Sequence, residues 1–319
     1  MCRTVALLLA LGLSSATGCD LAKPKVLATN PGPATAPRPD AGAPNDDPAP
    51  GLPPAGPPGL SLSDAGAPAR DAAPAASDAG DGTTVLVYAH SGSDLFRVHP
   101  QTLEITRVGN FLVKLGARDR FLNTVTDIAL DKDGHMTGIT FTELLSINVE
   151  TAECQVIAPL RQGEAMNGLS WIRTDNGEEI LAATGTDGSV LRIDPKTGAA
   201  SVIGNLGKGQ RSSGDLVSVS NYGTLITLRG DGASAAQGNG TDLLAKIDVV
   251  TGAATVIGPT GFKHVYGIGF WGNRVFGFTD SGQFILIDPK TGAGTEVQQT
   301  TAYPFWGAGV STSAPVTIE

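Results

Sequence analysis

Cysteine is scarce in this sequence, with three among 319 residues, which is too few for a scaffold held together by disulfides. Long hydrophobic runs are also missing: the longest, Val5–Leu13, is too short to span a bilayer. Basic residues are outnumbered 22 to 31 by acidic ones, giving a formal charge of −9. Because affinity for phosphate depends on Lys and Arg, the composition argues against a nucleic-acid partner. No segment has a convincing helical spacing of apolar residues.

The amino terminus has the pattern of an export signal over residues 1–18. Arg3 precedes the short apolar run, and small residues lead to Ala16–Thr17–Gly18–Cys19. This tetrapeptide resembles the lipobox of bacterial lipoproteins. The resemblance implies acylation of Cys19 and a lipid-anchored protein of the bacterial cell envelope, on the periplasmic side of either membrane or at the cell surface. The alternative is ordinary signal cleavage that leaves Cys19 as a free thiol.

Residues 19–83 have the composition of a disordered tether. Residues 20–83 hold 14 of the 21 prolines and no aromatic residue. Such a segment cannot bury enough apolar surface to offset its loss of conformational entropy. Proline pairs stiffen it, so we expect a semi-rigid spacer between the anchor and a folded part that spans residues 84–319.

The sequence from residue 84 onward contains five copies of one pattern, in which a β-strand leads into a polar turn. Equivalent apolar positions fall at residues 98, 147, 193, 247 and 287, a spacing of 40 to 54 residues that suits four strands per repeat. In Ile193–Asp194–Pro195–Lys196–Thr197–Gly198, the Asp accepts backbone N–H groups, Pro presets φ, and Gly takes the left-handed position. The repeats therefore predict an all-β fold in which each turn joins the third and fourth strands of a propeller blade.

Strand counting predicts how the ring closes. The first repeat has only Val85–Tyr88 ahead of its hairpin, whereas Trp306–Val310 has the first-strand pattern with no blade after it. We therefore expect a five-bladed β-propeller in which the C-terminal strand completes the first blade. Aligning the five first strands places one small residue of each near the axis, at Ala129, Ser170, Ser218, Gly269 and Gly309.

The repeat organisation resembles that of bacterial propeller proteins of the YVTN and quinoprotein-like kind. The resemblance implies a fold and leaves the activity open. Quinoprotein repeats end in a tryptophan after the turn, but here Thr197–Gly198–Ala199 and Thr291–Gly292–Ala293 lack it. No cofactor is therefore expected.

One face of such a propeller offers a candidate binding site at the mouth of its channel. The first residues of the innermost strands form a ring there, made of Thr126 or Asp127, Asn167, Asp215, Tyr266 and Trp306. Amides, carboxylates and aromatic rings around a hollow suit a sugar, a peptide or another small polar ligand. Loops on this face also carry basic residues that could attract an anion, namely Lys114, Arg118, Arg120, Arg161, Lys208, Arg211, Lys263 and His264. The alternative is that these charges are merely solvated and that the ring only hydrates a channel.

We expect a monomeric, non-enzymatic module that binds a polar or anionic small molecule, a glycan or an envelope protein. The alternative is a carbohydrate-active hydrolase that uses Asp127 and Asp215 as paired carboxylates. No histidine group has the spacing of a metal site, and the Asp131–Gly134 stretch fits a hairpin turn better than a calcium loop. Cys154, which has no nearby base in the sequence, is expected to be a buried structural thiol.

Overall fold

The structure is a computed structural model that describes residues 85–116, 118–160, 166–174, 176–300 and 302–318. The predicted signal peptide, Cys19, the tether and the predicted rim residue Arg161 lie outside these residues. Within them, no helix combines the length and the hydropathy that crossing a bilayer requires.

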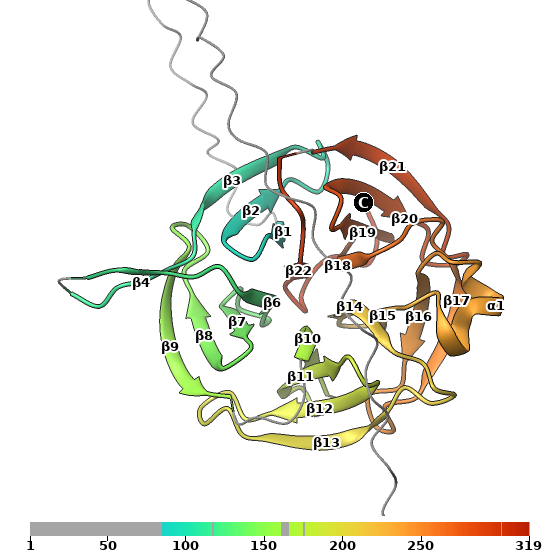
Figure 1. Ribbon diagram of the computed structural model, residues 1–319, viewed down its shortest axis with the longest axis horizontal. Coiled ribbons are helices and arrows are strands. Elements are labelled where there is room, and N and C mark those ends of the chain that lie inside the picture. The colour runs from blue at the N-terminus through green and yellow to red at the C-terminus, as the bar shows by residue number, and fades with distance from the viewer. Residues whose placement is uncertain (1–84, 117, 161–165, 175, 301, 319) are drawn as a thin grey trace, which may run out of the picture. The chain divides into compact units, whose positions relative to one another are not determined.

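The described residues form a five-bladed β-propeller, as predicted (Figure 1). Each blade is an antiparallel sheet whose strands run in order from the axis to the rim. The innermost strands are β22 (Gly307–Val310), β6 (Val125–Leu130), β10 (Met166–Arg173), β14 (Ser212–Val219) and β18 (Val265–Trp271). The second strands are β1 (Val87–His90), β7 (Met136–Thr140), β11 (Glu179–Gly185), β15 (Gly223–Leu228) and β19 (Arg274–Thr279).

The outer half of each blade is the repeated hairpin. The third strands are β2 (Asp94–Val98), β8 (Glu143–Ile147), β12 (Ser189–Ile193), β16 (Leu243–Ile247) and β20 (Gln283–Ile287). The fourth strands are β3 (Ile105–Asn110), β9 (Glu153–Pro159), β13 (Ala200–Asn205), β17 (Ala254–Pro259) and β21 (Gly294–Gln299).

The ring is closed by the carboxyl-terminal strand. Strand β22 pairs antiparallel with β1, with Gly307 opposite His90 and Val310 opposite Val87. The first blade therefore combines residues from both ends of the folded part, and the two strands next to the axis leave no open edge between them. This pairing confirms the closure predicted from the strand count.

The repeated turn has the chemistry that its residues predict. In the third blade, Asp194 Oδ1 accepts the backbone N–H groups of Lys196 at 2.9 Å and Thr197 at 3.0 Å, and Gly198 has φ +67°. These backbone hydrogen bonds lower the pKa of Asp194. In the first blade His99 replaces the aspartate, and its Nδ1 accepts from Gln101 and Thr102. The recurring acidic residue is therefore a turn residue.

The hydrophobic core lies between neighbouring blades. Each sheet contributes fully buried side chains to clusters on both of its faces; for example, Phe96, Phe278, Phe284 and Phe305 join the first and fifth blades. Phe96 and Phe305 meet edge to face with ring centroids 5.7 Å apart. The ring is thus a closed series of sheet-on-sheet contacts.

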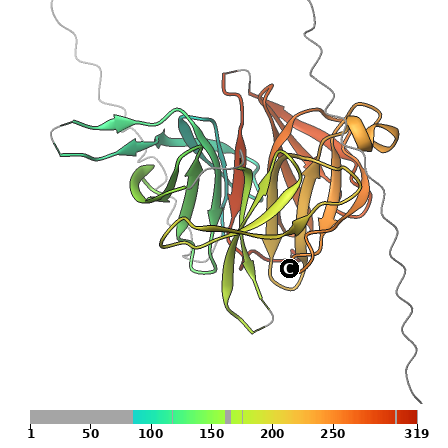
Figure 2. The ribbon, with the colours of Figure 1, turned by 60° about the horizontal axis from the view of Figure 1, so that its bottom comes forward.

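Two additions to the repeat were not predicted in this form. Strands β4 (Leu112–Val113) and β5 (Arg120–Phe121) form a hairpin that extends beyond the ring (Figures 1 and 2), and β4 pairs parallel with β9. The glycine-rich insertion 230–240 in the fourth blade holds a 3-10 turn, Gly232–Ser234, and one short helix, α1 (Ala235–Gly238).

The predicted alignment of small residues is wrong in the fourth blade. In the second blade Leu130 faces Met136, which faces Ile147. In the fourth blade Ser218 faces Thr224, which faces the equivalent Ile247. Ser218 therefore corresponds to Leu130 and not to Ala129, and each residue of this inner strand lies one position further along than the sequence alignment places it. The cause is an irregularity in the β14–β15 pairing between Ser212 and Leu216.

Candidate functional site

A cavity of about 510 Å³ opens where the five inner strands begin. Its size falls in the range of roughly 300–1,000 Å³ that is common for small-molecule sites. Every blade contributes to the cavity wall one residue at or near the start of its inner strand. These residues are Thr126, Asn167, Gly214, Tyr266 and Trp306. We call these five residues the mouth ring.

Local backbone irregularities place the mouth ring at the cavity. The pairing of the first and second strands shifts register at Val125/Asp127, Met166/Gly168 and Val265/Gly267. The residue skipped at each shift is Thr126, Asn167 or Tyr266, and each of these lines the cavity. A β-bulge redirects a side chain in this way. Four predicted ring members, Thr126, Asn167, Tyr266 and Trp306, thus meet in one wall.

Asp127 and Asp215 lie one residue further along their strands than the mouth ring. Neither lines the cavity, and both side chains are 0% exposed. In the fourth blade Gly214 takes the place in the ring that the sequence alignment assigns to Asp215. The geometry therefore separates these two carboxylates from the predicted ligand contacts.

Asp127 joins the second and third blades through its two carboxylate oxygens. Its Oδ1 accepts the backbone N–H of Ile128 at 2.9 Å, and its Oδ2 accepts that of Leu169, which belongs to the next inner strand, at 2.5 Å. His90 Nε2 lies 3.6 Å from Oδ1. Both oxygens of Asp127 are thus engaged by backbone donors.

Asp215 joins the fifth and first blades. Its Oδ2 accepts the backbone N–H groups of Ile268 at 2.8 Å and Ala308 at 3.1 Å. Its carboxyl group is also hydrogen-bonded to that of Asp127. The two aspartates therefore connect the inner strands of all five blades at the axis, and we call them the axial carboxyl pair.

The axial carboxyl pair shares a proton. Burial raises the pKa of both groups well above the usual value for aspartate, and the nearby Asp215 raises that of Asp127 further. The hydrogen bond between the two carboxyl groups raises the pKa of Asp127 and lowers that of Asp215.

Glycine occupies the equivalent position in the other three blades, at Gly168, Gly267 and Gly307. A Cβ on Gly307 would lie 2.3 Å from both Asp127 Oδ1 and His90 Nε2, and one on Gly267 would lie 2.6 Å from the Gly307 carbonyl carbon. Two aspartates and three glycines therefore fill the axis next to the mouth ring. A hydrolase needs carboxylates that can flank a glycosidic bond, and this enclosed pair has no access to one.

Further residues of the cavity wall come from segments that the ring argument did not include. The insertion in the fourth blade and its flanks supply Arg229, Gly230, Asp231, Gly240 and Asp242, and other loops and strand ends supply Phe141, Met166, Thr186, Ser212 and Ser213. Asp242 Oδ2 accepts from Ser213 Oγ at 2.6 Å and from the Val265 N–H at 2.8 Å, and burial raises the pKa of Asp242. The length of the loop between the second and third strands of the fourth blade could have indicated this contribution, because loops at that position lie on the same face as the mouth ring.

Most of the predicted basic rim lies away from the cavity or is paired with carboxylates. Of the described rim residues, Lys263 and His264 line the wall, whereas Lys114, Arg118, Arg120, Lys208 and Arg211 do not. Arg120 makes two hydrogen bonds to Glu143, at 2.9 and 3.0 Å. Lys114 pairs with Asp119 at 3.1 Å. Fewer cations therefore contribute to the electrostatic potential at the cavity than the sequence predicts.

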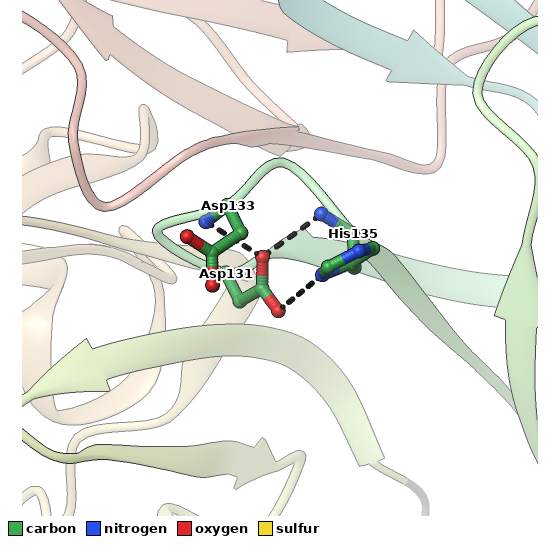
Figure 3. Close-up of side chains that lie close together, drawn as sticks. All are labelled: Asp131, Asp133 and His135. Atoms are coloured by element: carbon green, nitrogen blue, oxygen red, sulfur yellow. Dashed lines mark hydrogen bonds and ion pairs between the residues drawn. The ribbon is translucent and has the colours of Figure 1, made fainter.

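Three side chains of one hairpin turn have atoms close enough to hold a metal ion. The possible ligand atoms of Asp131, Asp133 and His135 lie within 4.8 Å of one another (Figure 3). Hydrogen bonds within the turn account for the arrangement, because Asp131 Oδ1 accepts the backbone N–H groups of Asp133 and His135 and Oδ2 lies 3.1 Å from His135 Nδ1. Asp133 also pairs with Lys132. We assign these residues to turn formation.

Cys154 lies in the core of the second blade and does not line the cavity. Its side chain is buried, and its Sγ donates to the Ala152 carbonyl at 3.4 Å. Burial raises the pKa of the thiol to about 11, so the reactive thiolate is not formed at neutral pH. These features suit a structural thiol.

No protein-family model matches the sequence, and no curated protein matches it. Among solved structures, one match is a protein of unknown function from Bacteroides caccae, with 12% identity over 69% of this chain and 74% of that chain and a TM-score of 0.37. Another is BamB from Moraxella catarrhalis, with 14% identity over 65% of this chain and 59% of that chain and a TM-score of 0.34.

Proposed function

We propose that this protein is a membrane-tethered binding module of the bacterial cell envelope, which holds a small polar ligand in the cavity at the mouth ring. The observation that carries the proposal is the convergence of all five blades on one cavity of about 510 Å³. Its wall combines the partly exposed aromatic rings of Tyr266 and Trp306 with the amide of Asn167 and the hydroxyl of Thr126. Aromatic surface with a few convergent polar groups is the usual composition of a small-molecule site.

The residues next to the mouth ring support binding in preference to hydrolysis. The axial carboxyl pair is fully buried, and backbone amides from several blades engage its oxygens. These hydrogen bonds hold the mouth ring in a fixed geometry before any ligand arrives. A preorganised wall lowers the entropic cost of binding.

The binding test uses the full chain and a panel of sugars, amino acids, short peptides and nucleotides. Ligands should raise the thermal midpoint of unfolding without being converted, and Trp306→Ala should weaken the response at least tenfold. Phe121→Ala is the matched control, because Phe121 is an aromatic residue that is 67% exposed and lies outside the cavity wall. If no compound of the panel binds, or if Trp306→Ala and Phe121→Ala behave alike, the proposal fails.

The proposed membrane tether rests on the sequence around Cys19, where Ala16–Thr17–Gly18–Cys19 resembles a lipobox. Acylation at this cysteine would anchor the chain, and the proline-rich segment would hold the propeller away from the lipid. Expressed in a bacterial host, the full chain should fractionate with membranes and carry acyl groups on the Cys19 peptide. Cys19→Ala should release it, whereas Cys2→Ala, a change to the other amino-terminal cysteine, should not. An unmodified Cys19 on a membrane-free protein would contradict the anchor.

A further inference from the structure

Each charged residue around the cavity is paired or buried, except one. Arg229 and Asp231 form an ion pair at 3.0 Å, and His264 Nδ1 lies 2.8 Å from Asp280 Oδ2. Asp242 is almost completely buried and is held by Ser213 and the Val265 amide. Lys263 is exposed and has no carboxylate within ion-pair distance in the described part of the chain. Lys263 is therefore the exposed cation of the cavity wall that is free to pair with a ligand.

The amide of Asn167 is the second unmatched group. Its Oδ1 is buried and has no hydrogen-bond partner among the described residues, although the residue lines the cavity. Leaving a buried polar atom unpaired costs about 1–3 kcal/mol, so a ligand that reaches this amide gains from pairing with it. A hydroxyl group is suited to the task, because it can donate to the amide oxygen and accept from the amide nitrogen.

The third element is a flat apolar surface. The rings of His264 and Tyr266 stack with centroids 5.5 Å apart and an interplanar angle of 21°, and both line the cavity. Trp306 also lines the cavity and packs close to Gly92, where an added Cβ would lie 3.1 Å from the indole. Aromatic walls of this kind favour the C–H face of a ring-shaped ligand over a flexible chain.

We infer that the ligand of this cavity is an acidic sugar, a hexose ring carrying a carboxylate, whose acid group pairs with Lys263 and whose hydroxyl pairs with Asn167. The inference rests on the proposed binding function and names its ligand class. A free uronic acid and the terminal unit of an acidic polysaccharide present the same chemistry. The cavity opens to solvent at the propeller face, so both forms can enter it.

The test compares galacturonate and glucuronate with galactose and glucose, by calorimetric titration of the full chain at low salt. Each acid should bind at least tenfold more tightly than its neutral counterpart, a difference of about 1.4 kcal/mol. Added salt should reduce this preference, because screening weakens an exposed ion pair. A digalacturonate arm separates the two sources: equal or tighter binding than the monomer indicates a polymer end, and much weaker binding indicates a free sugar.

Lys263→Met should remove the tenfold preference of the acids over their neutral counterparts. Lys208→Met is the matched control, since Lys208 lies in the corresponding loop one blade earlier and does not line the cavity. Asn167→Leu should weaken acids and neutral sugars alike. Equal binding of acids and neutral sugars, a preference that survives Lys263→Met, or no sugar binding at all would each overturn the inference. If another class from the broader panel then bound in a Trp306-dependent way, the proposed binding function would stand without this ligand.

Discussion

Replacing Asp215 should show whether the axial carboxyl pair holds the propeller together. In Asp215→Ala, the backbone N–H groups of Ile268 and Ala308 lose their acceptor, and Asp127 loses its hydrogen-bonded partner. Each orphaned buried donor costs about 1–3 kcal/mol, so the two together cost about 2–6 kcal/mol. We therefore expect a loss of about 2–6 kcal/mol, a large part of the 5–15 kcal/mol that is typical of a folded domain.

Asp215→Asn should behave very differently at the same position. The asparagine carbonyl can accept from Ile268 and Ala308, while its NH₂ group can donate to Asp127. We expect its unfolding free energy to lie within about 1 kcal/mol of the parent. Asp127→Asn should be worse than Asp215→Asn, because both oxygens of Asp127 accept N–H groups and an amide nitrogen would face one of them.

Urea unfolding of the full chain at pH 7, followed by tryptophan fluorescence, measures these differences. Asp231→Ala, a change of an exposed cavity carboxylate, is the control and should shift stability by less than about 0.5 kcal/mol. An Asp215→Ala variant within 1 kcal/mol of the parent would refute the structural role of the pair. Equal damage from Asp215→Asn and Asp215→Ala would show that the acceptor oxygen for Ile268 and Ala308 does not stabilise the ring.

The pair also predicts a pH dependence. Its pKa values are raised, so the folded protein keeps a proton that the unfolded chain releases above about pH 3.8. This contribution to stability is complete below pH 3.8 and is lost as the pH rises through the folded-state pKa. Asp215→Asn removes this titration, so its stability should decline less than that of the parent between neutral and alkaline pH. Parallel pH profiles for the two proteins would contradict the shared proton.

Three further predictions concern the residues around this pair. Burial lowers the pKa of His90 to about 4 from the usual 6.5, so the unfolding free energy of the parent should fall by up to about 3 kcal/mol as the pH falls from 6.5 to 4. His90→Gln should flatten that part of the pH profile measured by urea unfolding. An unchanged slope would rule out His90 as its source. Gly307→Ala should lower the thermal midpoint of unfolding by several degrees, because the added Cβ would lie 2.3 Å from Asp127 Oδ1. An unchanged midpoint would show that the axis is loosely packed. Deleting residues 307–319 should abolish the cooperative transition in calorimetry while deleting only 318 and 319 should not, and a cooperative melt of the longer deletion would show that β22 is dispensable.

The propeller itself could be predicted because its signals are local. The Asp194 turn needs only an acceptor side chain, a proline and a glycine within six residues, and the same turn recurs at a four-strand spacing. The closure by β22 followed from counting strands, since a blade with one strand too few needs one supplied from elsewhere. The first inference needs only a few neighbouring residues, and the second needs only the number of strands.

The position of Asp215 could not be predicted in the same way. An alternation of apolar residues fixes which side chains share a face, but it does not report the irregularity between Ser212 and Leu216, which moves every residue of β14 by one position. The pairing of the predicted rim residue Arg120 could not be read from the sequence for a related reason. Arg120 and Glu143 are 23 residues apart, and only the β4–β5 hairpin, which has no counterpart in the repeat, brings them together. Long-range pairing decides which charges remain free.

The cavity wall and the packed axis are separated by one residue along the inner strands. Thr126 borders the cavity and Asp127 the axis; Tyr266 and Gly267 divide the same tasks, as do Trp306 and Gly307. The first residue of each pair has room to change because its side chain lines a cavity, whereas at Gly267 and Gly307 even an added Cβ would lie within 3 Å of a neighbouring strand. Substitutions in the mouth ring should therefore alter ligand choice at little cost in stability, while substitutions one residue later should unfold the ring. A propeller arranged in this way can change its ligand without changing its fold, so the identity of the mouth-ring residues, and not the repeat that supports them, carries the information about function.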